Sequence, residues 1–287
     1  MKKYRAIFFD WDGTAVMSRR APADRAVKAM APLLDQGIPL VIVSGTTIEN
    51  IAGGEIAKYF TPEQLNHLYL GLARGAYNYR FTAGEPEIFA DMMPDTDTLL
   101  KIHQTCFDLH LILKRDYNFD TDIVFTRPNY CKIDLMVGYD RGESLFMQGS
   151  ELDALRRSLQ EHGIAGGTQE LIDLSVKLAA DYGIKTATTC DAKYLEVGLS
   201  SKTDNTNAIY RHLVRKYGIT AAQCSFWGDE FVGLEPGVFG SDSFMRTELT
   251  GAGDFFDVSE TAGERPEGVI VLGGGVETFL EFLRCQA

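Results

Sequence analysis

The sequence has no long hydrophobic run and few cysteines, and these absences exclude whole classes of protein. Hydrophobic residues make up 45% of the 287, yet no apolar segment approaches the roughly 20 residues that span a bilayer. The five cysteines are scattered without a CxxC pair, so they indicate neither a disulfide framework nor a zinc site. The first residues combine lysines with early acids, unlike a secretory leader. We therefore expect a soluble, cytoplasmic protein with no membrane partner.

Basic residues are scarce relative to acidic ones. The chain has 28 Lys and Arg against 40 Asp and Glu, a formal net charge of -12. Proteins bind a phosphate backbone through clustered Lys and Arg, which this sequence lacks, so we expect no nucleic acid partner. A small phosphorylated substrate stays compatible with this charge, because a few local cations and a metal ion can reverse the field inside one cleft.

The order of the apolar segments at the start of the chain predicts an α/β fold. Residues 4–10 form a strand-like run, residues 22–37 carry apolar side chains at helical spacing, and residues 38–47 contain a second, β-branched run. Residues 48–60 are expected to form another helix. This alternation favours a Rossmann-like core with three layers, in which helices cover both faces of a parallel sheet.

The alternation of strands and helices stops in the middle of the chain. Residues 82–192 mix strand-like and helical segments, and a pattern of strands and helices returns after them. We interpret 82–192 as an inserted α+β cap domain and 1–81 together with 193–287 as the core that it interrupts. No amphipathic seam points to a partner helix, so the oligomeric state stays open.

Polar residues follow three of the expected core strands. Asp10 and Asp12 follow the first strand, Ser44 and Gly45 follow the second, and Asp229 follows a later one. In open parallel sheets, functional groups gather at the carboxyl ends of the strands. Alone, the two acids of "DWD" are most often a solvated loop and "SGTT" is as easily an ordinary helix cap. Three such strand ends in one sheet make these plainer interpretations weaker.

The chemistry of these residue types indicates a phosphate site. Acids from several strands would repel one another unless a cation lies among them, and a hard divalent ion, above all Mg²⁺, prefers oxygen ligands. Ser44 and Gly45 precede an expected helix, whose N-terminus offers unpaired N–H groups and a partial positive charge to an anion. A metal site beside an anion site suggests a phosphorylated ligand.

These segments resemble the four motifs of the haloacid dehalogenase (HAD) superfamily of phosphohydrolases. Its first motif, DxDGT, stands at residues 10–14, and its second stands at residues 44–46. Its third motif, a lysine that opens a helix, is similar to Lys202, and its fourth, an acid-bearing loop, to residues 227–245. The resemblance covers residues 1–80 and 193–287.

The resemblance implies a role for each matching residue. Asp10 is the expected nucleophile, which forms an aspartyl-phosphate, and Asp12 the expected general acid and base. Ser44, Gly45 and Lys202 are expected to bind the phosphoryl group of the substrate.

The resemblance also implies a Mg²⁺ site. Its expected ligands are the Asp10 carboxylate, the backbone carbonyl of Asp12, Asp229 and a second acid of the fourth motif. The family commonly places this second acid four or five residues after the first, where this sequence has Gly233 and Leu234. Asp242 is favoured for this role, and Glu230 is the alternative.

The position of the insert resembles that of a type C2 cap, and its composition resembles the C2B, or Cof-type, branch. The resemblance implies a magnesium-dependent phosphomonoester hydrolase that acts on a small phosphorylated metabolite such as a sugar phosphate. A sugar phosphomutase and a catalytically silent sensor of phosphorylated ligands stay as alternatives. Within the cap, the cations Arg127, Lys132 and Lys177 are of interest, but solvated surface charge is the favoured interpretation of each.

Overall fold

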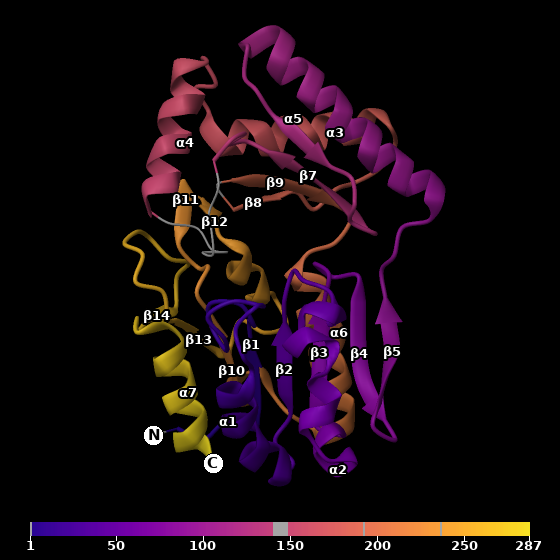
Figure 1. Ribbon diagram of the computed structural model, residues 1–287, viewed down its shortest axis with the longest axis vertical. Helices are drawn as coiled ribbons and strands as arrows, with labels where there is room; N and C mark the ends of the chain where they lie inside the picture. Colours follow the sequence, from indigo (N-terminus) through magenta and orange to yellow (C-terminus); the bar gives the residue numbers. More distant parts are fainter. Residues whose placement is uncertain (1, 140–148, 192, 236) are drawn as a thin grey trace.

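The computed structural model describes residues 2–139, 149–191, 193–235 and 237–287, and it contains two main sheets, one above the other (Figure 1). The strands of the larger sheet are β1 (Ala6–Phe9), β2 (Leu40–Val43), β3 (Leu68–Leu72), β4 (Tyr77–Thr82), β5 (Glu85–Asp91), β10 (Cys224–Gly228), β13 (Asp254–Asp257) and β14 (Val269–Val271). They lie in the order β14-β13-β10-β1-β2-β3-β4-β5. Neighbours from β14 to β3 are parallel, whereas β4 and β5 are antiparallel additions at one edge.

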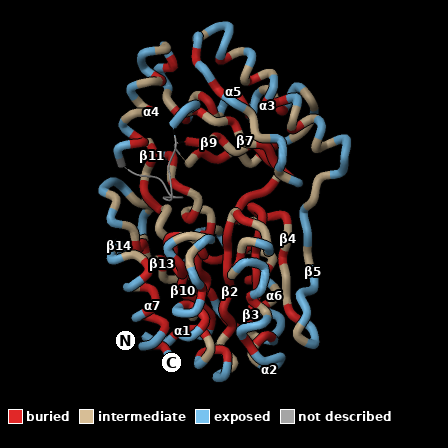
Figure 2. Tube along the Cα trace, viewed as in Figure 1, coloured by how far each residue is buried: buried red, intermediate tan, exposed pale blue. Residues whose placement is uncertain are grey.

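Helices cover both faces of the larger sheet. Ile7 and Phe9 of β1 pack in one cluster with apolar residues of α1 (Asp24–Asp35) and α7 (Gly275–Gln286). Phe8, between them, packs on the opposite side with residues of α6 (Lys202–Tyr217). Since side chains alternate along a strand, "AIFF" is buried on both faces. These three layers confirm the predicted α/β core, and Figure 2 shows its central strands as buried.

The smaller sheet lies beyond the carboxyl end of β1. Its strands are β6 (Asp122–Val124), β7 (Tyr130–Asp134), β9 (Tyr194–Gly198) and β8 (Thr189–Cys190), antiparallel in that order. Helices α3 (Thr96–Tyr117), α4 (Gly149–Glu161) and α5 (Gly167–Asp181) share one apolar cluster with one face of this sheet. The other face is turned toward the larger sheet (Figure 1).

The chain passes from one sheet to the other at positions that differ from the expected insert boundaries at residues 82 and 192. β5 follows residue 82 but pairs with β4 in the larger sheet, because Ala83 and Gly84, both at positive φ, form a tight hairpin turn. β9 follows residue 192 but pairs with β7 in the smaller sheet. We infer a cap that begins after β5 and ends with β9.

Three short elements that follow β10 in the chain lie near the carboxyl ends of the strands. The hairpin of β11 (Gly233–Glu235) and β12 (Val238–Phe239) packs Leu234 and Val238 into the apolar cluster of the smaller sheet. A 3₁₀ turn, η5 (Ser241–Met245), follows it. Within the described ranges, no helix combines the length and the apolarity needed to cross a membrane.

Candidate active site

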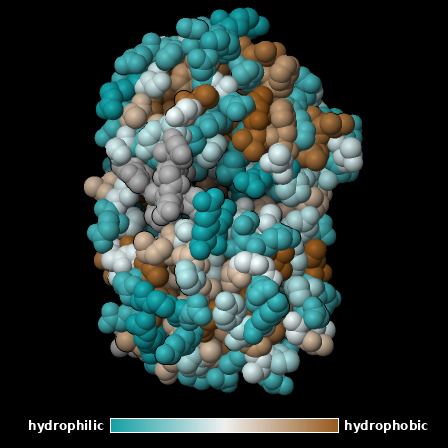
Figure 3. Space-filling model, viewed as in Figure 1, coloured by the Kyte–Doolittle hydropathy of each residue, from teal (hydrophilic) through white to brown (hydrophobic). Residues whose placement is uncertain are grey.

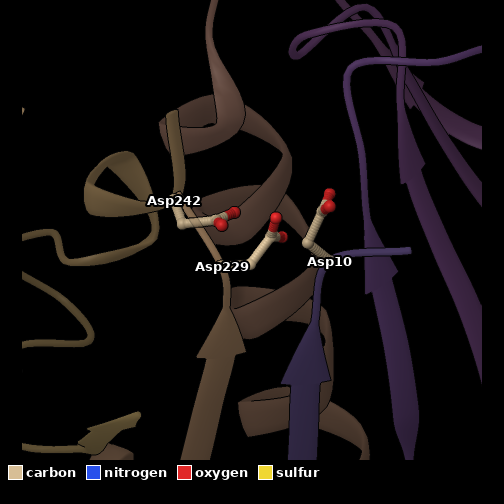
Figure 4. Close-up of side chains that lie close together, drawn as sticks. All are labelled: Asp10, Asp229 and Asp242. Carbon is tan, nitrogen blue, oxygen red and sulfur yellow. The ribbon is translucent and has the colours of Figure 1, made fainter. Parts of the chain in front are cut away.

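Three carboxylates converge at the carboxyl ends of two adjacent central strands. Asp10 follows β1 and Asp229 follows β10, its parallel neighbour, while Asp242 comes from η5. Oxygen atoms of the three side chains lie within 4.8 Å of one another, and Figure 4 shows the side chains turned toward one common space. The backbone N–H of Asp10 donates to the carbonyl of Trp227 at 2.9 Å, which fixes the strand end. Such a set of oxygen ligands could hold a divalent metal ion.

Two glycines allow the carboxylates to approach the backbone. A Cβ at Gly13 would lie 2.1 Å from Oδ2 of Asp229, and one at Gly228 would lie 2.2 Å from Oδ2 of Asp242. Gly13 also has a φ of +81°, a conformation that favours glycine. The carboxylates of Asp229 and Asp242 therefore lie directly against the backbone, where any other residue would place a side chain.

Lys202 joins the cluster from the first turn of α6. Its Nζ donates to Oδ1 of Asp10 at 2.8 Å and to Oδ1 of Asp242 at 2.7 Å, and its side chain is buried. Ser201 caps the helix, and Asp204 completes a capping box, so the start of the helix is fixed at this position. The structure thus brings Asp10, Lys202 and Asp242, which lie far apart in the sequence, into direct contact.

Burial and the repulsion of neighbouring acids raise the pKa values of Asp10 and Asp229. Burial above all, with Asp242 and Asp12 adding to it, raises the pKa of Asp10 to about 8, although Lys202 opposes the rise. Burial, Glu230 and Asp242 raise the pKa of Asp229 well above its usual range. A divalent cation among these oxygens would favour the charged forms. The donor set therefore fits a metal ion.

Glu230 lies beside the cluster. Burial raises its pKa to about 7, and it accepts a hydrogen bond from Ser241 at 2.8 Å. Its backbone N–H donates to Oδ2 of Asp242 at 2.8 Å. Of the two acids considered for the second position of the fourth motif, Asp242 is the one grouped with Asp10 and Asp229.

The carboxylate of Asp12 has a different partner, Arg19, which sequence reasoning missed. Nη2 of Arg19 lies 2.8 Å from Oδ2 of Asp12, and its Nη1 donates to Oγ1 of Thr46 at 3.2 Å. Burial raises the pKa of Asp12, and Arg19 opposes that rise. The only signal for Arg19 in the sequence is a pair of arginines in the loop after the first motif.

Replacing Arg19 with Gln is expected to lower the turnover rate roughly tenfold, because Asp12 loses the group that orients it. Since Arg19 lowers the pKa of Asp12, its loss should also shift the pH profile of kcat to higher pH. Steady-state kinetics across a pH series measures both effects. Arg25→Gln, which removes an exposed ion pair with Glu277, is the matched control and should change neither. An unshifted pH profile in Arg19→Gln would contradict this role.

Ser44 and Gly45 lie at the neighbouring strand end, on the wall of the same cleft. Ser44 follows β2 and is buried, and the backbone N–H of Thr46 donates to its Oγ at 3.4 Å. The helix predicted for residues 48–60 is wrong: three short 3₁₀ turns occupy the segment, because Gly53 and Gly54 both adopt positive φ. An anion here would meet loop N–H groups and a hydroxyl instead of the N-terminus of an α-helix.

A cavity of about 670 Å³ connects the acid cluster with the smaller sheet. Asp10, Asp12, Ser44 and Lys202 line its lower wall, and residues of β7 and β9 line its upper wall. On the face seen in Figure 3, hydrophilic side chains border the seam between the two parts of the molecule.

The cap cations fall into two groups. Lys132 and Arg127 line this cavity and are partly buried, so the expectation of solvated surface charge is wrong for both. Lys177 on α5 is exposed, as expected.

The fold is similar to that of several solved phosphatases. An IMP-nucleotidase from Plasmodium falciparum with bound IMP aligns with 98% of this chain and 68% of its own, at 12% identity and a TM-score of 0.60. A trehalose-6-phosphate phosphatase from Aspergillus fumigatus aligns with 99% of this chain and 92% of its own, at 15% identity and a TM-score of 0.56. A sucrose-phosphatase from Synechocystis, in complex with sucrose and phosphate, aligns with 99% of this chain and 98% of its own, at 12% identity and a TM-score of 0.56.

These similarities concern the fold. They confirm the architecture that the HAD resemblance implies, a parallel α/β core with a cap domain. No protein-family model and no curated protein sequence matches the chain.

Proposed function

We propose that this protein is a magnesium-dependent phosphatase that hydrolyses a small phosphorylated metabolite, in particular a sugar phosphate. The observation that carries the proposal is the contact of Lys202 with Asp10 and Asp242 at the carboxyl end of β1, beside Asp229. This arrangement offers a nucleophile, a cation for a phosphoryl oxygen and a set of metal ligands in one place. The similar folds of a trehalose-6-phosphate phosphatase and a sucrose-phosphatase support the choice of sugar phosphates.

In the proposed reaction, a carboxylate oxygen of Asp10 attacks phosphorus, and the bond from phosphorus to the leaving oxygen breaks. Asp12 gives its proton to the leaving oxygen. Water then attacks the phosphorus of the aspartyl-phosphate as Asp12 takes a proton from it, so phosphate leaves and the Asp10 carboxylate is restored. The burial that raises the pKa of Asp12 suits the acid step, and Arg19 keeps the base form accessible.

The remaining residues of the site bind and orient. Lys202 would hold a phosphoryl oxygen, and Ser44 with the N–H groups of Gly45 and Thr46 would hold another. Asp10, Asp229 and Asp242 would hold Mg²⁺, with the backbone carbonyl of Asp12 as a further proposed ligand. Such an ion, when bound, neutralises phosphate charge. The cavity under the smaller sheet would enclose the leaving group and keep bulk water away from the reacting atoms.

The test is release of inorganic phosphate from a panel of sugar phosphates, nucleotides and cofactor phosphates, with magnesium and with a chelator. We expect release that requires the metal and falls roughly 100-fold or more in Asp12→Ala, the usual range for a lost general acid and base. Isomer exchange of sugar phosphates without phosphate release would indicate a mutase. Full activity in chelator or in Asp12→Ala would contradict the proposed mechanism.

A further inference from the structure

The upper wall of the cavity presents a set of charged and aromatic side chains. Because side chains alternate along strands, Tyr130 and Lys132 of β7 and Tyr194 and Glu196 of β9 face the cavity. The intervening Ile133 and Leu195 face the apolar core of the smaller sheet. The wall is therefore a fixed surface on a sheet, with its geometry set by strand register.

Glu196 is the acid at the centre of this wall, and two cations hold it. Nε of Arg74 lies 2.7 Å from Oε2 of Glu196, and Nζ of Lys132 lies 2.6 Å from Oε1. Arg74 also donates to Oγ1 of Thr189 at 2.6 Å and lies over the ring of Tyr130, 4.9 Å from its centroid. Arg74 and Glu196 are thus locked in place, and one carboxylate serves two cations.

Among the described residues, Arg127 is the cation of this wall without an ion pair. It lines the cavity close enough to Glu196 to lower the pKa of that carboxyl, yet it forms no ion pair with any residue that the structure describes. Its Nε is buried without a hydrogen-bond partner in the described parts of the chain. The other lysine of the wall is Lys193, whose Nζ lies 3.0 Å from Oδ2 of Asp134.

The charges of the described wall do not balance. Its cations outnumber its acids by four to three: Arg74, Arg127, Lys132 and Lys193 against Asp134, Asp191 and Glu196. A partly desolvated guanidinium without a partner is costly, and an anion that arrives with the substrate would remove that cost.

We propose that the substrate carries a second anionic group, a carboxylate or another phosphate, which binds Arg127 and Lys132 at the end of the cavity away from Asp10. This inference rests on the proposed phosphatase function and narrows its substrate class. The guanidinium can bind a carboxylate or phosphate through two parallel hydrogen bonds, and Lys132 adds a point charge beside it. Since a cavity of about 670 Å³ exceeds what one phosphoryl group needs, it leaves room for a sugar-sized body between the two anions.

The test compares matched pairs of phosphate esters that differ at the end away from the ester. Glycerol 3-phosphate is paired with 3-phosphoglycerate, and glucose 6-phosphate with both 6-phosphogluconate and glucose 1,6-bisphosphate. We expect kcat/KM to favour the member with the extra anion by about tenfold or more, the range of a charge-assisted hydrogen bond. The comparison of 6-phosphogluconate with glucose 1,6-bisphosphate shows whether the wall prefers a carboxylate or a second phosphate.

Arg127→Gln should remove this preference. The variant is expected to lose about tenfold or more in kcat/KM on the favoured substrates, mainly through KM, and to change little on glucose 6-phosphate. Lys177→Gln, which removes an exposed cation of the same domain outside the cavity, is the matched control and should retain the preference. If Arg127→Gln lowered kcat/KM equally for both substrates of a matched pair, the result would contradict the proposal.

Binding to Asp10→Asn separates this inference from the proposed function. Calorimetric titration of that variant with the same pairs measures the preference without turnover. Phosphate release without preference for either member would overturn the second anion site and leave the phosphatase intact. Tighter binding of the doubly anionic members, lost in Asp10→Asn/Arg127→Gln, would support the site even if no pair is hydrolysed.

Discussion

Asp10→Asn is expected to abolish phosphate release, with a loss of roughly 10⁴-fold or more, because an amide oxygen cannot replace the carboxylate nucleophile. The fold should survive the change. The amide oxygen can still accept the hydrogen bond from Lys202, and the substitution removes one of several buried charges of like sign. Phosphate release and thermal unfolding, measured side by side, check the two halves of this prediction.

Asp254→Asn is the matched control for this experiment. Asp254 lies in the same sheet, on β13, and does not line the cavity. Its Oδ2 lies 2.5 Å from Nζ of Lys2, with which it forms an ion pair. The control variant should retain full turnover. Substantial activity in Asp10→Asn would show that another residue is the nucleophile.

Lys202→Met is expected to have the second large effect, on both stability and activity. Removing one partner of a buried ion-pair network leaves its other members uncompensated, and we expect a loss of about 3–5 kcal/mol in the free energy of unfolding. Turnover should fall because the phosphoryl group loses its cation. Denaturant unfolding in chelator measures the first effect. Lys28→Met, which removes an exposed lysine of α1, is the matched control and should be nearly neutral.

The loss of stability in Lys202→Met should depend on pH. The pKa of folded Asp10, about 8 in the native protein, lies above its unfolded value, so the charged form of Asp10 opposes folding as pH rises toward 8. Lys202 lowers this pKa, so the variant should raise it further. The two proteins should therefore lose stability in parallel up to about pH 8, and the difference in their unfolding free energies should be larger at pH 9 than at pH 6. A difference independent of pH would show that the ion pair contributes little.

The core and the strand-end acids could be predicted from the sequence because local patterns determine them. "AIFF" and "LVIV" have no polar residue, so both strands must be buried on two faces, and the residues after them must reach the sheet edge. Parallel pairing then brings Asp10 and Asp229 together. The HAD resemblance added Lys202, whose approach to Asp10 depends on a helix that begins 192 positions later.

Features set by tertiary packing could not be predicted in the same way. The glycines at 53 and 54 prevented the expected helix, although the residues around them suit one. The contact of Arg19 with Asp12 depends on how a loop folds back, and the approach of Arg74 to Glu196 depends on the placement of the smaller sheet. Neither contact has a periodic or spacing signal in the sequence.

The central claim, that Asp10 carries the phosphoryl group during turnover, is tested most directly by acid quench and peptide mass spectrometry. The protein is mixed with magnesium and a substrate from the panel, quenched within the first turnover and digested. The account predicts one added phosphoryl group on the peptide that contains Asp10, absent in Asp10→Asn. Turnover in the native protein with a phosphoryl group on another residue, or undiminished turnover in the variant, would contradict it.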